Sequence, residues 1–129
     1  MVVSINFSLE IISPDKKIYS GTTSEVIIPC FEGLMTILKD HIPLITFLRP
    51  GFIEIKDFED KFYVEEGTIE FSNNNLLILT SSAINLKNLN EKKKDDLIKN
   101  AEKEMLKSTI SDKEKYILNY KIETLKQIN

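Results

Sequence analysis

Apolar and polar residues alternate with a period of two through much of the first two thirds of the chain. Six segments have the alternation, or the β-branched and aromatic composition, that is typical of strands: Asn6–Ile11, Glu25–Ile28, Phe52–Ile55, Phe62–Val64, Ile69–Phe71 and Leu76–Thr80. Between the last two lies Asn73-Asn74-Asn75, a favourable hairpin turn because asparagine tolerates the left-handed region. Strands that recur at this spacing predict an antiparallel sandwich or barrel rather than a parallel sheet.

After Asn90 the apolar period lengthens to that of a helix. An apolar stripe is predicted on each of two helices, formed by Leu97, Ile98, Ala101 and Met105 on the first and by Leu118, Ile122 and Leu125 on the second. Asn90 is placed to cap the first helix, and Ser111 with Glu114 forms a capping box for the second. The connection around Ser108–Ile110 is short, which predicts an antiparallel helical hairpin.

Composition and charge divide the chain at nearly the same place. All four glycines and all four prolines lie at or before Gly67. Residues 1–85 carry six basic and twelve acidic side chains, a net charge of −6, whereas residues 86–129 carry eleven and eight, a net charge of +3. We therefore predict a sandwich of about ten antiparallel strands over residues 1–86 and a helical hairpin over residues 87–129, with the basic hairpin suited to an acidic surface, the sandwich included.

Several classes of protein are disfavoured by the sequence. No apolar run approaches the roughly 18 residues of a membrane span. The first residues lack a basic stretch followed by an apolar one, so no secretory signal is visible and a cytosol-facing protein is expected. The chain has one cysteine, Cys30, and one histidine, His41. An internal disulfide and a Cys-rich zinc site are thus excluded, and we expect a protein without an active site of its own.

The remaining candidates for chemistry have simpler interpretations. Asp40 and His41 are adjacent, but neither a nucleophile nor a metal ligand completes a catalytic set, so we expect His41 to bond to nearby backbone. Cys30 is expected to be a small buried side chain rather than a reactive thiol. The run Lys92–Lys94 has no interleaved aromatic residues and is followed by two aspartates, which favours a solvated helical face over a nucleic-acid site.

An ordered set of motifs carries a family resemblance. The segment Glu32–Thr46 contains Glu-Gly, an aliphatic residue, His-x-Pro and an apolar pair. Leu48–Gly51 provides an aliphatic-basic-Pro-Gly turn, Phe62–Phe71 a hairpin, Ser82–Ile84 an end of the sandwich, and Ile18–Gly21 an aromatic-Ser-Gly turn. This set, together with the change from strands to a terminal helical hairpin, resembles the epsilon subunit of F-type ATP synthases over essentially the whole chain.

The resemblance implies a non-catalytic rotor subunit of a proton-translocating ATP synthase, peripheral to the cytoplasmic face of a bacterial inner membrane or to the stromal face of a thylakoid. It implies that the sandwich binds the gamma shaft and the ring of c subunits, and that the hairpin either folds down or extends toward the catalytic alpha and beta subunits and impedes ATP hydrolysis. Ser13 and His41 match positions that face the shaft, and Glu32-Gly33 matches the edge that meets the ring. At Leu34 an acidic residue often found in relatives is absent.

A second departure from the family pattern concerns the nucleotide-binding motif. Some relatives bind ATP through an aliphatic-Asp-x-x-Arg-Ala motif, where this chain has Leu89–Lys94 with Asn, Lys and Lys at the three informative positions. Lysine lacks the planar fork of arginine, so we expect no ATP binding and no cofactor. The alternative function from another class is a small β-domain adaptor that binds protein or nucleic acid through its basic hairpin. The sandwich's charge of −6 disfavours nucleic acid, because affinity for it depends on phosphate neutralisation.

Overall fold

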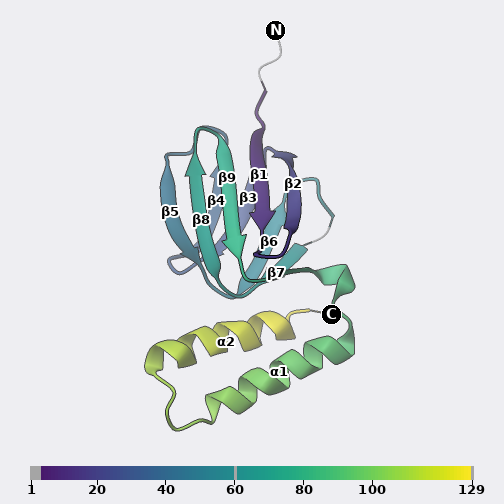
Figure 1. The fold of residues 1–129 in the computed structure, drawn as a ribbon, viewed down its shortest axis with the longest axis vertical. Helices are drawn as coiled ribbons and strands as arrows, with labels where there is room; N and C mark the ends of the chain where they lie inside the picture. Colours follow the sequence, from purple (N-terminus) through teal and green to yellow (C-terminus); the bar gives the residue numbers. More distant parts are fainter. Residues whose placement is uncertain (1–3, 60, 129) are drawn as a thin grey trace.

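The computed structural model of the chain describes residues 4–59 and 61–128. Ten strands are present in these residues: β1 (Phe7–Ile12), β2 (Lys17–Thr23), β3 (Glu25–Cys30), β4 (Gly33–Leu38), β5 (Leu44–Leu48), β6 (Gly51–Ile55), β7 (Lys61–Val64), β8 (Gly67–Ser72), β9 (Asn75–Thr80) and β10 (Ala83–Asn85). They stack in two layers above a pair of helices (Figure 1). The predicted sandwich followed by a helical hairpin is confirmed.

The two layers have five strands each. One layer has the order β10-β7-β6-β3-β4 and the other β5-β8-β9-β1-β2, and the two are joined where Cys30 of β3 pairs with Leu48 of β5. Neighbouring strands are antiparallel with one exception. β1 and β9 run parallel, with Leu9 beside Leu76, so the prediction that all strands are antiparallel is wrong for this pair. The pairing joins segments 67 residues apart, and the local alternation of apolar and polar residues cannot predict which distant strands pair.

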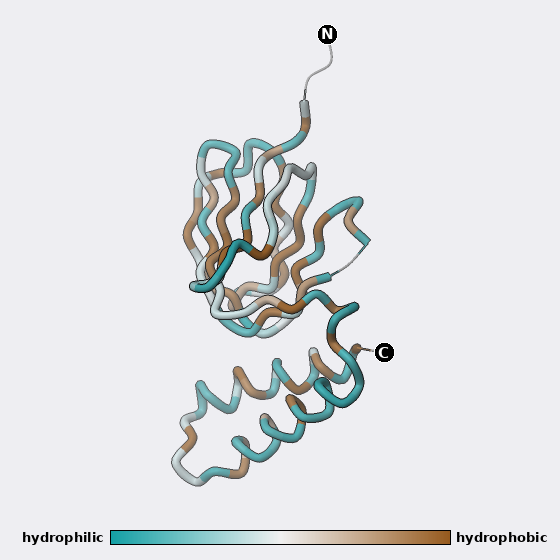
Figure 2. The backbone as a smooth tube through the Cα atoms, turned by 45° about the vertical axis from the view of Figure 1, so that its right-hand side comes forward, coloured by the Kyte–Doolittle hydropathy of each residue, from teal (hydrophilic) through white to brown (hydrophobic). Residues whose placement is uncertain are grey.

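The main core lies between the two layers and follows the period of two. Phe7, Leu9 and Ile11 of β1 are buried while the residues between them are only half-buried. The same alternation appears as recurring apolar positions along the strands in Figure 2. At the hairpin between β8 and β9, Asn73 and Asn74 have φ angles of 50° and 59°, which confirms the asparagine turn.

The helices begin at the predicted caps. A short 3₁₀ helix, η1 (Leu86–Asn88), leads into α1 (Glu91–Met105), whose first turn is capped by the Asn90 side chain at 2.7 Å from the backbone N of Lys93. α2 (Asp112–Lys126) begins after Ser111, whose hydroxyl accepts a hydrogen bond from the Glu114 backbone N–H at 3.1 Å. α2 lies between the sandwich and α1 (Figure 1). α1 ends at Met105 and α2 begins at Asp112, so the break predicted around Ser108–Ile110 is confirmed.

A second, smaller core joins the hairpin to the sandwich. It consists of buried Tyr63, Leu89, Leu125 and Ile128, with partly buried neighbours from both units. In the predicted stripes Ala101, Leu118 and Leu125 are buried, whereas Leu97, Ile98, Met105 and Ile122 are only half-buried. The apolar stripe of α1 thus faces α2 more than the sandwich, because α2 occupies the position next to the strands.

Candidate interaction site between the sandwich and helix α2

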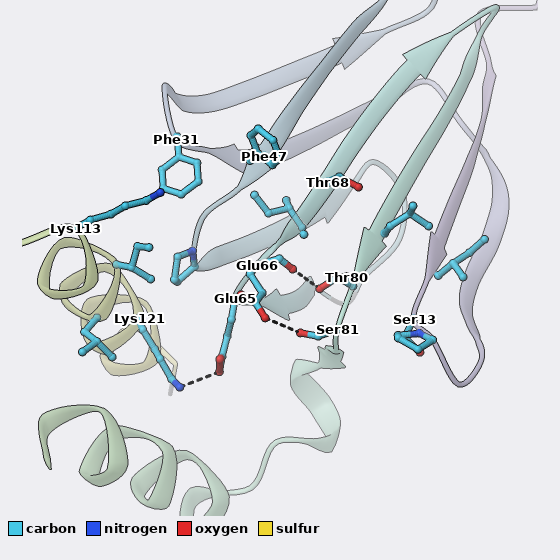
Figure 3. Close-up of a pocket in the computed structure, with 18 residues that line it drawn as sticks. Ser13, Phe31, Phe47, Glu65, Glu66, Thr68, Thr80, Ser81, Lys113 and Lys121 are labelled. Carbon is cyan, nitrogen blue, oxygen red and sulfur yellow. Dashed lines mark hydrogen bonds and ion pairs between the residues drawn. The ribbon is translucent and has the colours of Figure 1, made fainter. Parts of the chain in front are cut away.

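A pocket of about 950 Å³ lies at the corner between the sandwich and α2 (Figure 3). Its walls come from the ends of β1, β5, β8 and β9 and from one side of the helix. The lining residues include Ile12, Ser13, Phe31, Phe47, Glu65, Thr68, Leu79, Lys113, Ile117 and Lys121. The pocket therefore depends on the sandwich and the hairpin together.

The sandwich side of the pocket continues into an apolar row on the outer face of one layer. Strand register places Phe47, Thr68, Leu79 and Ile12 side by side across β5, β8, β9 and β1. Phe47 is 57% exposed, Leu79 is 44% exposed, and Ile45, two residues before Phe47 on β5, is 75% exposed. Side chains of this size at such exposure, clustered on one face, are typical of interaction surfaces. We call Ile12, Ile45, Phe47 and Leu79 the outer apolar row.

The helix side of the pocket carries lysines, one of which is bound to the sandwich. The Lys121 ammonium lies 3.1 Å from a carboxylate oxygen of Glu65, and this ion pair is drawn as a dashed line in Figure 3. The Tyr63 hydroxyl donates to the same carboxylate oxygen at 3.3 Å. Burial, and then the charge and hydrogen bond of Glu65, raise the pKa of Tyr63 far above its ordinary range, so this hydroxyl remains a donor.

Arg49 makes a second link between the sandwich and α2. Its guanidinium carbon lies 4.2 Å from the centre of the Tyr120 ring, within the range of a cation–π contact. The Arg49 Nε donates to the Cys30 carbonyl oxygen at 2.9 Å, which fixes the guanidinium on the sandwich. One turn further along α2, the Thr124 hydroxyl lies 3.4 Å from the Pro50 carbonyl oxygen. We call Arg49–Tyr120 and Glu65–Lys121 the hairpin contacts.

The structure brings some of the predicted interface residues to this corner. Ser13 lies in the turn after β1 and lines the pocket, and its backbone N–H donates to the Lys16 carbonyl oxygen at 2.9 Å. Glu32 lies in the turn from β3 into β4, next to the pocket residue Phe31, and Gly33 begins β4. The exposed Glu32 carboxylate accepts a hydrogen bond from the Thr46 hydroxyl at 3.3 Å.

His41 lies at the other end of the sandwich. It precedes β5 at the Leu44 end, whereas the pocket adjoins the Leu48 end, so the structure does not join His41 to Ser13 in a single site. Its Nδ1 is 2.8 Å from the Ile42 carbonyl oxygen and its ring meets Phe71 edge-on, which confirms the expected backbone bond. The Asp40 carboxylate accepts from the Asn74 side chain at 2.9 Å, so it is not an orienting partner for His41.

The other chemical candidates have structural roles. Cys30 is fully buried, and burial, followed by the Glu32 charge, raises the pKa of its thiol to about 11. Lys92 and Lys93 are exposed as predicted, whereas Lys94 is half-buried and its ammonium lies 3.0 Å from the Ile128 carbonyl oxygen. Within residues 4–59 and 61–128 the structure contains no cluster of three His, Cys, Asp or Glu side chains that could hold a metal.

Sequence reasoning missed the outer apolar row and the hairpin contacts. The signal for the row was present in Leu44–Leu48, where residues on both faces of the strand are apolar apart from one threonine. A strand with one solvated face alternates apolar and polar residues, so apolar residues on both faces indicate a second covered surface. No local pattern indicates Arg49 with Tyr120, because the two residues are 71 positions apart.

Residues 6–86 match the family described as ATP synthase, Delta/Epsilon chain, beta-sandwich domain. The ATP synthase epsilon chain of Pelagibacter ubique is 46% identical over 130 residues, covering 98% of this chain and all of the relative. This chain belongs to the ATP synthase epsilon-chain family. A further epsilon chain, from Allorhizobium ampelinum, is 31% identical and covers 92% of this chain and 86% of its own length.

Solved structures agree with the fold of this epsilon chain. A chain in the Euglena gracilis mitochondrial ATP synthase structure with OSCP, F1 and c-ring has a TM-score of 0.75 at 18% identity and covers 98% of this chain, which in turn covers 82% of that chain. A chain from the Tetrahymena thermophila central stalk and c-ring structure has a TM-score of 0.67 at 16% identity, with 93% of each chain covered. At these identities the likeness concerns the fold.

Family membership decides between the two functions considered from the sequence. The chain is an epsilon subunit of ATP synthase, a structural and regulatory subunit that is not itself catalytic, and the adaptor alternative is not favoured. Neither helix in the described part of the chain is long and apolar enough to cross a membrane. The subunit is a peripheral part of a membrane-bound complex.

Proposed function

We propose that this epsilon chain links the gamma shaft of a proton-translocating ATP synthase to its ring of c subunits. The observation that carries the proposal is the outer apolar row, in which Ile45, Phe47 and Leu79 are solvent-exposed in the isolated chain and which continues into the corner pocket. The similar Tetrahymena chain comes from a central stalk with its c-ring, which supports a rotor position. In this proposal the row and Ser13 bind the shaft, His41 contributes at the far end of the same layer, and the Glu32-Gly33 turn meets the ring.

Replacement of Phe47 by glutamate tests the shaft interface. Phe47 is 57% exposed, so the fold should tolerate a glutamate at this position. In the complex, however, the new carboxylate would be buried at the interface without a partner of opposite charge. Loss of an aromatic contact at an interface centre costs about 2 kcal/mol or more, so we expect affinity for the purified shaft subunit to fall at least about 30-fold by calorimetry. Leu106→Glu is the matched control, because Leu106 is 86% exposed on the hairpin. Equal affinities for the two variants would contradict the proposal.

The hairpin is proposed to regulate ATP hydrolysis by leaving the sandwich and reaching the catalytic subunits. Support comes from the nature of the contacts that hold it in the described part of the chain, which are a small apolar cluster, single pairs and one hydroxyl bond: the second core, the hairpin contacts and the Thr124 hydroxyl bond. The hairpin is in equilibrium between a docked and a released state. A surface on the catalytic subunits that binds the released hairpin, and favours it by a few kcal/mol, would invert this equilibrium. Deletion of residues 90–129 should raise ATP hydrolysis by the assembled enzyme and leave ion-coupled synthesis intact. Unchanged hydrolysis would show that the hairpin is a static brace.

The chain is also proposed to work without bound ATP. Asn90 uses its side chain to cap α1, and Lys94 is committed to the Ile128 carbonyl oxygen and to Glu91 at 3.0 Å. Both residues stand where nucleotide-binding relatives have other side chains, so phosphate would have to displace existing contacts. NMR titration of the isolated chain with ATP should give no saturable shifts in α1 below millimolar concentration. Saturable shifts at Leu89–Lys94 would overturn this proposal.

The proposed location is the cytoplasmic face of a bacterial inner membrane, or the stromal face of a thylakoid if the chain is plastid-encoded. The support is the bacterial source of the Pelagibacter relative, which is 46% identical. A tag placed after the C-terminus should react with antibody in inverted membrane vesicles and not in sealed right-side-out vesicles. The opposite pattern would place the subunit on the other face.

A further inference from the structure

Strand β4 is an edge of its layer that differs from the other edges of the sandwich. Within the described residues it pairs only with β3. Its sequence, Gly-Leu-Met-Thr-Ile-Leu, contains neither a charge nor a proline, and its pairing with β3 runs through all six residues without a bulge. Leu34 is 68% exposed and Leu38 is 51% exposed. A long, regular and apolar edge strand readily pairs with another chain.

The other three edges carry the features that discourage such pairing. β10 has only three residues. β2 begins with Lys17, which is paired with Glu10 at 3.0 Å, and its register with β1 shifts at an irregularity between Ile11 and Ile12. β5 follows Pro43, and the Glu32 carboxylate reaches its Thr46 hydroxyl. Charge, irregular pairing, proline and short length all protect edges, so β4 is the unprotected one among the described strands.

Backbone hydrogen bonds show which groups of β4 point outward. The Pro29 carbonyl oxygen accepts from the Arg49 N–H at 3.1 Å, and the Glu25 carbonyl oxygen accepts from the Lys56 N–H at 3.0 Å, so both residues direct their backbone away from β4. Opposite them in the register stand Leu34 and Leu38. In an antiparallel pair, residues in these positions direct their own backbone groups away from the partner strand.

Thr36 lies midway between the two leucines and shares their orientation by the period of two. The Leu38 carbonyl oxygen is used by the His41 N–H at 3.1 Å. In the described part of the chain the outward groups left without a protein partner are therefore the N–H and C=O of Leu34 and Thr36 and the N–H of Leu38. They form a regular ladder of donors and acceptors, which is the complement of an extended strand.

We propose that an extended segment of another rotor subunit completes β4, pairing with the backbone of Leu34 and Thr36 and covering the side chains of Leu34 and Leu38. The inference rests on the proposed function and goes beyond it, since the outer apolar row lies on the other layer. Glu32 stands at one end of β4 and Lys39 at the other, so the strand that fits is apolar in its middle, basic beside Glu32 and acidic beside Lys39.

A second copy of this chain fits the edge less well. Antiparallel pairing of two β4 strands about a twofold axis at Thr36 would set Leu34 opposite Leu38 of the other copy. It would also set Glu32 opposite Asp40 at both ends. Like charges directly opposite each other on paired strands are destabilising. The charge pattern therefore favours a partner strand of different sequence.

Residue-resolved amide hydrogen exchange tests the proposal on the wild-type chain. In the isolated chain the amides of Leu34 and Thr36 should exchange fast, whereas those of Met35 and Ile37, which face β3, should exchange slowly. In the purified ATP synthase that carries the chain, exchange at Leu34 and Thr36 should slow at least about 100-fold, as expected for amides in a paired strand. Unchanged exchange there in the assembled enzyme would overturn the proposal.

The other outcomes are also decisive. Protection of Leu34 and Thr36 that rises with concentration in the isolated chain would assign the edge to a second copy and overturn the proposal. A chain that does not enter the enzyme would overturn the proposed function and this inference together, whereas an incorporated chain with fast-exchanging amides would overturn this inference alone.

Substitutions at Thr36 provide an independent readout. Proline there removes an N–H that points away from β3, so the edge can accept it, but a partner strand cannot bond to it. Incorporation of Thr36→Pro into the enzyme should fall at least about tenfold, and Thr36→Val, which keeps the N–H, should incorporate normally. Should Thr36→Pro fail to fold by circular dichroism, Leu34→Lys replaces it, with the same expected loss. Normal incorporation of the folded variant would contradict the proposal.

Discussion

Truncation of Leu125 should detach the hairpin while the sandwich stays folded. Leu125 is fully buried and packs with Tyr63, Leu89 and Ile128 in the second core. Leucine-to-alanine changes at such sites cost about 2–5 kcal/mol. Full burial of one large apolar side chain contributes about 1.5–3 kcal/mol. Leu125 of α2 and Ile128, which follows the helix, are two such side chains in the second core. The substitution thus removes an amount comparable with the contribution of these two side chains.

Circular dichroism and NMR can separate detachment from global unfolding. Isolated helices of about 15 residues are marginal in water, so detachment in Leu125→Ala should lower the helical signal at 222 nm. Amide resonances of β1–β9 should keep their dispersion, and those of α1 and α2 should move toward random-coil positions. Leu106→Ala is the control, with an expected change within about 0.5 kcal/mol because Leu106 is exposed. A single cooperative transition at a lower temperature, with both units lost together, would refute the reasoning.

Three further predictions concern stability. Gly67→Ala should lower the free energy of unfolding by about 3 kcal/mol or more in urea titrations, because its φ of 152° is unfavourable for alanine and the new Cβ would collide with the Leu79 carbonyl oxygen. A loss under 1 kcal/mol would contradict this. The thiol of Cys30 has a pKa of about 11 in the folded chain and an ordinary value near 9, so its contribution to stability is constant below pH 9 and falls by about 2–3 kcal/mol between pH 9 and 11. The fall should be smaller in Cys30→Ala, and an identical pH profile would exclude the thiol as its cause. A double-mutant cycle on Glu65 and Lys121 should give a coupling of about 0.2–1 kcal/mol that weakens in salt, because the pair is partly exposed, and a coupling indifferent to salt would contradict its ionic character.

Local features of the fold could be predicted from the sequence alone. Alternation located the strands of the core, as Phe7, Leu9 and Ile11 show, because a strand buried on one face must place apolar residues at every second position. The caps at Asn90 and Ser111 followed from the need of the first helical turn for acceptors. The bond of His41 to nearby backbone was likewise predicted, since the sequence offers this imidazole no partners of a catalytic set.

The candidate interaction surfaces, in contrast, could be identified only from the tertiary structure. The corner pocket exists because α2 and the ends of β1, β5, β8 and β9, which come from distant parts of the chain, line the same cavity. The contact of Arg49 with Tyr120 joins residues 71 positions apart. The free edge of β4 is defined by which strands do not pair with it, and strand order depends on the global packing of both layers. Local patterns arise from interactions along a few residues and are therefore visible in sequence, whereas strand order and helix docking are set by contacts between distant segments.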